Sequence, residues 1–160
     1  MLRRVFVPLL VFACTTAASI TSVTTVAVKP AAGATPAACT GTIDITHLAF
    51  KPRKVAPGES STAHLVARNC TRSSVEANVT WVATWVGPAS GTYPSGCPVI
   101  DPISESADFT PRGKFISEMN YEVPGGCEAS GLYLTVRISA ESGQITQRSA
   151  DLKIEQVTPV

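Results

Sequence analysis

Few side chains in this sequence are of the types that do chemistry, and their spacing limits what they could do. Two histidines, His47 and His64, precede a group of three carboxylates, Asp101, Glu105 and Asp108. Histidines at facing positions of neighbouring strands could hold a metal ion or respond to pH. A pair of carboxylates could serve as general acid and base. The simpler interpretation of both sets is that they are polar residues on a solvated surface.

The surroundings of these residues favour the simpler interpretation. The two histidines fall in one predicted hairpin with no third ligand in view, so no metal site and no cofactor are expected. Serine and threonine abound, but neither G-x-S-x-G nor another nucleophile motif appears. We therefore expect no catalytic residues and a protein that is not an enzyme. The less favoured alternative is an enzyme with its site in the irregular stretch 87–113.

Aromatic side chains offer binding chemistry, because exposed rings can stack on sugars. Trp81 and Trp85 share one face of a predicted strand, roughly 13 Å apart. Small and aliphatic residues fill the rest of that face, which favours a core position for Trp81, while Trp85 near the strand end could be buried or exposed. Tyr93 in a loop and the outward-facing Tyr133 are surface candidates. The predicted ligand-binding residues are thus Trp85, Tyr93 and Tyr133.

Five cysteines occur, and one of them, Cys14, falls in the N-terminal leader. The other four form no C-x-x-C pair, which argues for two disulfides rather than a metal site. Three connectivities are possible. If 42–50 and 61–69 are antiparallel neighbours, their pairing positions sum to roughly 110, which brings Cys39 next to Cys70. We prefer this pairing among the four cysteines Cys39, Cys70, Cys97 and Cys127, which leaves the last two to pair with each other.

The first 34 residues have the pattern of a secretory signal peptide. Arg3 and Arg4 precede the apolar run Val5–Ala18, and Ala32-Gly33-Ala34 offers a small-x-small cleavage site. We expect cleavage after Ala34. Two alternatives stay open, a cut near Ala18 and an uncleaved anchor over Val5–Val28. The expected organisation is a signal peptide over 1–34, a flexible segment over 35–41 and one domain over 42–157.

Charge excludes two classes of partner. The whole chain has 13 Lys and Arg against 12 Asp and Glu, and removal of Arg3, Arg4 and Lys29 leaves ten against twelve, a net charge of −2. Such a surface has no basic stripe for nucleic acid and no polybasic patch for a membrane. Membrane contact is expected only through the leader, if it stays uncleaved.

The stretch Ser74–Val86 organises the predicted fold. Its residues alternate between an apolar and a more polar face, with the period of two that marks a strand, and we expect it to be the central strand. The 87–113 stretch is predicted to hold at most short edge strands near 99–100 and 107–109. About seven strands with intervening turns predict an all-β, immunoglobulin-like antiparallel β-sandwich. The further predicted strands are 42–50 (with a bulge or a switch of face at 48–50), 61–69, 114–123, 130–140 and 145–155.

A short segment also resembles a known group of modules. Residues 50–69, FKPRKVAPGESSTAHLVARN, contain an extended P-x-x-V-x-P-G-E segment that leads into a strand. This resembles the opening of bacterial immunoglobulin-like modules of the CARDB and NEW3 kind. The resemblance implies a sandwich module of an exported protein, of the linker, adhesive or carbohydrate-associated type, without catalytic residues. Cys70 and the two tryptophans depart from that pattern.

Together these features predict a secreted, non-catalytic binding or scaffolding module at or outside the cell surface. The expected partner is a cell-surface protein or polysaccharide, with no nucleic acid. A carbohydrate-binding module that uses exposed aromatics is the main alternative, and pairing through sheet edges is another. Asn69 and Asn78 begin N-x-T sequons, which matter only in a host that glycosylates exported proteins.

Overall fold

The computed structural model describes residues 39–87 and 91–156. They belong to the second of the chain's two units, Ala37–Val160. The predicted signal peptide, Cys14 and residues 35–38 lie outside the described residues. Within the described ranges no helix has the length and apolar character needed to cross a membrane.

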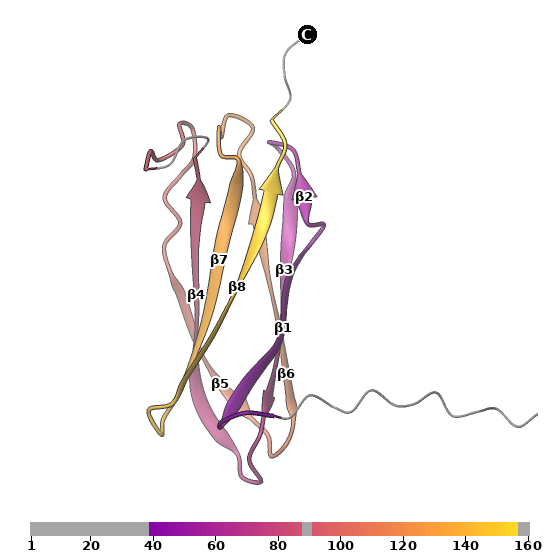
Figure 1. Cartoon of the computed structure of the whole chain (residues 1–160), viewed down its shortest axis with the longest axis vertical. Helices are drawn as coiled ribbons and strands as arrows, with labels where there is room; N and C mark the ends of the chain where they lie inside the picture. Colours follow the sequence, from indigo (N-terminus) through magenta and orange to yellow (C-terminus); the bar gives the residue numbers. More distant parts are fainter. Residues whose placement is uncertain (1–38, 88–90, 157–160) are drawn as a thin grey trace, which may run out of the picture. The chain divides into compact units, whose positions relative to one another are not determined.

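Eight strands make up the described part of the chain (Figure 1). A three-stranded sheet has the order β1-β3-β6, and a five-stranded sheet has the order β2-β8-β7-β4-β5. The strand bounds are β1 Ile43–Lys51, β2 Lys54–Val55, β3 Ser60–Asn69, β4 Val75–Val86, β5 Ile103–Phe109, β6 Lys114–Glu122, β7 Gly131–Ala140 and β8 Ile145–Ile154.

This arrangement confirms the predicted all-β, immunoglobulin-like sandwich. β1, β3 and β6 correspond to strands A, B and E of an immunoglobulin domain, and β8, β7, β4 and β5 to strands G, F, C and C′. Two details differ from expectation. β4 has neighbours on both sides, but the middle strand of its sheet is β7. The two-residue β2 pairs parallel with β8, so one pairing is not antiparallel.

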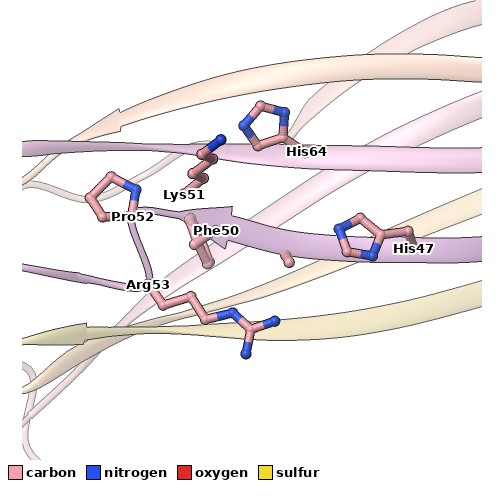
Figure 2. Close-up of a pocket in the computed structure, with 7 residues that line it drawn as sticks. His47, Phe50, Lys51, Pro52, Arg53 and His64 are labelled. Atoms are coloured by element: carbon pink, nitrogen blue, oxygen red, sulfur yellow. The ribbon is translucent and has the colours of Figure 1, made fainter.

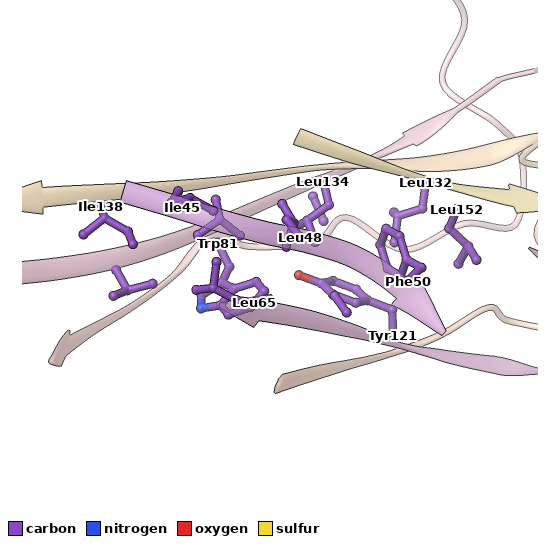
Figure 3. Packing of buried hydrophobic residues seen from close by; sticks show 14 of the residues in the cluster. Ile45, Leu48, Phe50, Leu65, Trp81, Tyr121, Leu132, Leu134, Ile138 and Leu152 are labelled. Carbon is purple, nitrogen blue, oxygen red and sulfur yellow. The ribbon is translucent and has the colours of Figure 1, made fainter. Parts of the chain in front are cut away.

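The core lies between the two sheets, and the alternation of β4 accounts for its contribution. Val79, Trp81 and Trp85 point inward and are buried, whereas Glu76 and Asn78, earlier in the same strand, face solvent. Figure 3 shows side chains of both sheets meeting in this layer, where the Phe50 and Tyr121 rings, 5.8 Å apart, pack edge to face. Burial of these apolar side chains is the main force that holds the sheets together.

Side-chain bonds close both open sides of the sandwich. On one side Arg148 of β8 donates from Nη1 to the backbone oxygens of Ile45, at 2.9 Å, and Thr46, at 3.2 Å. The register of β1 against β3 shifts between Ile45 and His47, so the bulge lies just before the predicted 48–50. The predicted switch of face is confirmed, because the buried residues change from Ile43 and Ile45 to Leu48 and Phe50. On the other side Ser117 of β6 donates to Glu105 of β5 at 3.2 Å.

The 87–113 stretch is more regular than predicted. Its second half forms β5, seven residues long, which includes the expected 107–109 and pairs along β4. No strand forms at 99–100. The sequence of β5 shows almost no alternation, because its first four residues are all exposed at a sheet edge, so the pattern did not predict a strand of this length.

Both disulfides form with the preferred connectivity. Cys39 bonds to Cys70, and Cys97 bonds to Cys127. The first attaches the residues before β1 to the end of β3. The second joins the 87–102 loop to the 123–130 loop, which fixes two connections that have no ladder between them.

Candidate functional site

Three connections gather at one end of the sandwich: 52–59, 87–102 and 123–130. Backbone bonds join them, from Gly58 N to Val123 O at 2.7 Å and from Glu128 N to Ser95 O at 2.9 Å. Gly96, with a φ of +71°, lies so close to Gly126 that a Cβ there would be 1.9 Å from the Gly126 carbonyl oxygen. Residues 95–97 of the 87–102 loop therefore pack closely against residues 126–128 of the 123–130 loop, where the Cys97–Cys127 bond also joins the two.

Trp85 is not an exposed ligand platform, which corrects one of the predicted site residues. Only 4% of Trp85 is exposed. Its indole Nε1 donates to the Pro98 carbonyl oxygen at 2.8 Å. A tryptophan at the end of a core-facing strand is covered here because the loop after the strand folds back over it. Trp85 thus positions the loop.

Tyr93 lies in that loop and is an exposed aromatic residue that shares a hydrogen-bond acceptor with Trp85. Its hydroxyl donates to the same Pro98 oxygen at 2.8 Å, which uses both lone pairs of that carbonyl. The residue is nevertheless 53% exposed. Its ring borders a hollow of about 460 Å³ that is also lined by Thr84, Val86 and Gly91.

Tyr133 extends this surface across the outer face of the five-stranded sheet. It lies opposite Thr84, which lines the Tyr93 hollow. Val82, Val86 and Tyr133 are 40%, 43% and 45% exposed. We call Val82, Val86, Tyr93 and Tyr133 the aromatic patch. The two valines were not selected from the sequence, although apolar residues on the otherwise polar face of β4 were a usable signal.

The two histidines lie near each other on the outer face of the three-stranded sheet. His47 is opposite Val66 and His64 is opposite Ala49, so the imidazoles are diagonal cross-strand neighbours. His64 Nδ1 is 2.9 Å from Glu118 Oε1. In the described ranges, no three His, Cys, Asp or Glu residues form a group that could hold a metal ion. The two histidines border a hollow of about 470 Å³ (Figure 2). We call His47, Lys51, Arg53 and His64 the basic groove.

The three candidate carboxylates do not converge. Glu105 accepts the Ser117 bond at the side of the sandwich. Asp108 lies opposite Glu76 on the outer face, and Asp101 precedes β5. Glu105 and Asp108 differ by an odd number of positions and so point to opposite faces of β5.

Comparison with known proteins gives likeness in fold only. No family model matches this chain, and no curated protein matches it. One similar structure is the alkylpurine DNA glycosylase AlkC of Pseudomonas fluorescens bound to DNA containing an abasic site analogue, with a TM-score of 0.51 and 11% identity over 72% of this chain and 31% of that one.

Two more structures extend this comparison. The sporulation control protein Spo0M of Bacillus subtilis has a TM-score of 0.51 and 9% identity over 72% of this chain and 50% of that one. PapD-like domain 7 of human CEP192 has a TM-score of 0.44 and 13% identity over 82% of this chain and 94% of that one. This chain thus spans half or less of the two bacterial proteins, so it matches one part of each.

Proposed function

We propose that this chain is an exported, non-catalytic immunoglobulin-like module that binds a protein or polysaccharide at the cell surface through the aromatic patch. Two disulfides are consistent with an oxidising, extracellular compartment. The leader pattern of residues 1–34 supports export. The segment 50–69, with its turn at Gly58, supports kinship with exported bacterial sandwich modules.

The observation that carries this proposal is the way Tyr93 is held. Its hydroxyl is fixed on the Pro98 oxygen that also accepts from Trp85, and the Cys97–Cys127 bond holds the same loop. An aromatic ring that is exposed but fixed contributes more to binding than a mobile one, because less conformational entropy is lost on association. A rigid exposed ring beside a hollow is a surface suited to recognition.

The test measures binding of the fluorescently labelled secreted protein to the surface of the cells that produce it. We expect Tyr93→Ala and Tyr133→Ala each to weaken binding about tenfold or more, as loss of an aromatic anchor does. Ile116→Ala is the matched control, since Ile116 is 65% exposed on the outer face of the other sheet. Equal binding by the tyrosine variants and the control would refute the role of the patch.

Two treatments of the cells separate the kinds of partner. Protease treatment abolishes binding if the partner is a protein. Periodate oxidation or digestion of surface glycans abolishes it if the partner is a polysaccharide, which is the carbohydrate-binding alternative.

A further inference from the structure

The basic groove concentrates positive charge on a domain whose excess charge is negative. Beyond residue 34 the chain has ten Lys and Arg against twelve Asp and Glu. None of the seven residues that line the hollow is acidic, and four of them are the basic-groove residues His47, Lys51, Arg53 and His64. The groove shares no lining residue with the aromatic patch.

Strand geometry accounts for this cluster. His47, Ala49 and Lys51 alternate along the outer face of β1, and His64 lies opposite Ala49 on β3. Three basic side chains therefore surround an alanine, whose small side chain leaves the hollow open. In Figure 2 Lys51 extends toward His64, and Arg53, just after the end of β1, extends on the other side of the strand, toward β8.

The two permanent cations of the groove, the side chains of Lys51 and Arg53, have no partner among the residues that the structure describes. His64 has Glu118 as a partner, and Lys54 next to the groove pairs with Glu155 at 2.5 Å. In contrast, the side chains of Lys51 and Arg53 donate no hydrogen bond to a carboxylate or carbonyl oxygen of the described ranges 39–87 and 91–156, and they form no ion pair there. Their ammonium and guanidinium donors are available to a ligand.

We propose that the basic groove binds an oxyanion, a carboxylate or a phosphate, with Lys51 and Arg53 as its permanent charged donors and His47 and His64 as further side chains that line the site. Ammonium and guanidinium groups form short, charge-assisted bonds to these anions. A volume of about 470 Å³ accommodates a small ligand such as a sugar that bears the anionic group. The same positive charges oppose a metal cation.

Other charged groups lie around the groove. Glu118 on β6 faces His64. Arg148 on β8 is bonded to the oxygens of residues 45 and 46, next to His47 in the chain. Asp151 on β8 lines a second, smaller hollow that shares Arg53 with the groove.

The test is a titration of the secreted protein followed by backbone amide NMR, at constant ionic strength, with inorganic phosphate and separately with glucuronate. Saturable shifts confined to residues 47–53 and 62–66 are expected from at least one probe, and the stronger probe identifies the anion class. Lys51→Gln/Arg53→Gln is expected to weaken binding about tenfold or more.

A matched control variant makes the result decisive. Arg72→Gln/Lys114→Gln removes the same charge from exposed sites away from the groove and is expected to bind as the unaltered protein does. The proposal fails if neither probe gives saturable, localised shifts, or if both charge-reduced variants lose affinity equally. Loss of the aromatic patch through Tyr93→Ala leaves this titration unchanged, so the two proposals fail separately.

Discussion

Asn69 ends β3 with its side chain fully buried and fully bonded. Its Nδ2 donates to the backbone oxygens of Ser73, Phe109 and Thr110 at 2.8 to 3.1 Å. Its Oδ1 accepts from both the backbone nitrogen and the hydroxyl of Thr71 at 2.8 Å. The side chain thus joins the turn after β3 to the end of β5. Because it is buried, its amide nitrogen is not accessible for glycosylation in the folded protein, although Asn69 begins a sequon.

We predict that Asn69→Ala lowers the free energy of unfolding by about 3 kcal/mol or more, because several buried backbone groups lose their partner at once. Asn78→Ala, at the exposed asparagine of the second sequon on β4, is expected to change it by about 0.5 kcal/mol or less. Urea unfolding monitored by tryptophan fluorescence measures both. Similar losses in the two variants would contradict the structural role of Asn69.

Ionisation of Tyr121 makes the stability of the fold depend on pH. Burial raises the pKa of Tyr121 to about 12. Its hydroxyl has only the weakly accepting Met119 sulfur, 3.4 Å away, as its hydrogen-bond partner among the described residues. The folded state therefore holds the phenol proton more tightly than the unfolded state, where the pKa is about 10. Stability from this group is complete below pH 10 and is lost as the pH rises toward 12.

We predict that Tyr121→Phe reduces the decline in stability between pH 10 and pH 12. Tyr133→Phe, at an exposed tyrosine, leaves that decline as it is. Thermal unfolding at stepwise alkaline pH provides the measurement. If the decline in the Tyr121 variant matched that of the unaltered protein, ionisation of this residue would not be its cause.

Residue-scale inference from the sequence had a clear limit. The period of two correctly placed Trp81 in the core and Tyr133 on the surface, because side-chain direction along a strand depends only on local geometry. The exposure of Trp85 was left open because it depends on how the following loop folds back, so that Pro98, 13 residues away in sequence, reaches the indole. Asn69 was noted only as a sequon, since two of its four partner residues, Phe109 and Thr110, come from a segment that meets it only in the fold.

At the scale of elements, the loop 87–102 owes its position to a close approach as well as to a disulfide. Gly96 and Gly91 both have positive φ, +71° and +90°, which L side chains rarely adopt. They differ in space, because a Cβ at Gly91 meets nothing within 4 Å, whereas one at Gly96 collides with the Gly126 carbonyl.

We predict that Gly91→Ala destabilises the fold by about 1–2 kcal/mol, the cost of a left-handed conformation. Gly96→Ala is expected to cost at least about 2 kcal/mol more, because the two loops must separate, and to move Tyr93 with the loop. Urea unfolding and the NMR shifts of the Tyr93 ring report these two effects. Equal costs for the two variants would mean that the contact between the loops contributes little.

Elements were predicted well where alternation was long. The strands at 130–140 and 145–155 agree with β7 and β8 to within a residue or two. β2 was missed because a strand of two residues has no periodicity. It pairs with β8, which is about 100 residues further along the chain, so the pairing cannot be seen in the local sequence. The bulge in β1 lies before the predicted position, and Arg148 bonds there to the backbone of Ile45 and Thr46, a long-range contact that alternation along one strand does not reveal.

At the scale of the whole molecule, the sandwich was foreseen because every level of the sequence agreed on it: alternating strands, turn residues and an even number of cysteines after residue 34. The aromatic patch and the basic groove were not foreseen as surfaces. Each combines residues from separate strands, and register, not order in the chain, decides which ones become neighbours.

Closure of the two sheets on each other is the remaining feature of the whole molecule. Arg148 is the side chain that joins β8 of one sheet to β1 of the other, through two hydrogen bonds from one charged nitrogen. Arg137 provides a matched comparison, because it is exposed on β7 and the described residues offer it no side-chain bond or ion pair.

We predict that Arg148→Ala lowers the free energy of unfolding by about 1.5–3 kcal/mol, the usual contribution of hydrogen bonds to a charged group, whereas Arg137→Ala changes it by about 0.5 kcal/mol or less. The loss should be local in origin, so amide exchange quickens first along β1 around the bulge, before the rest of the three-stranded sheet. Urea unfolding and hydrogen exchange followed by NMR measure the two effects. Uniformly faster exchange throughout both sheets would instead place Arg148 among general contributors to the fold, and the closure of this side would then depend on the core alone.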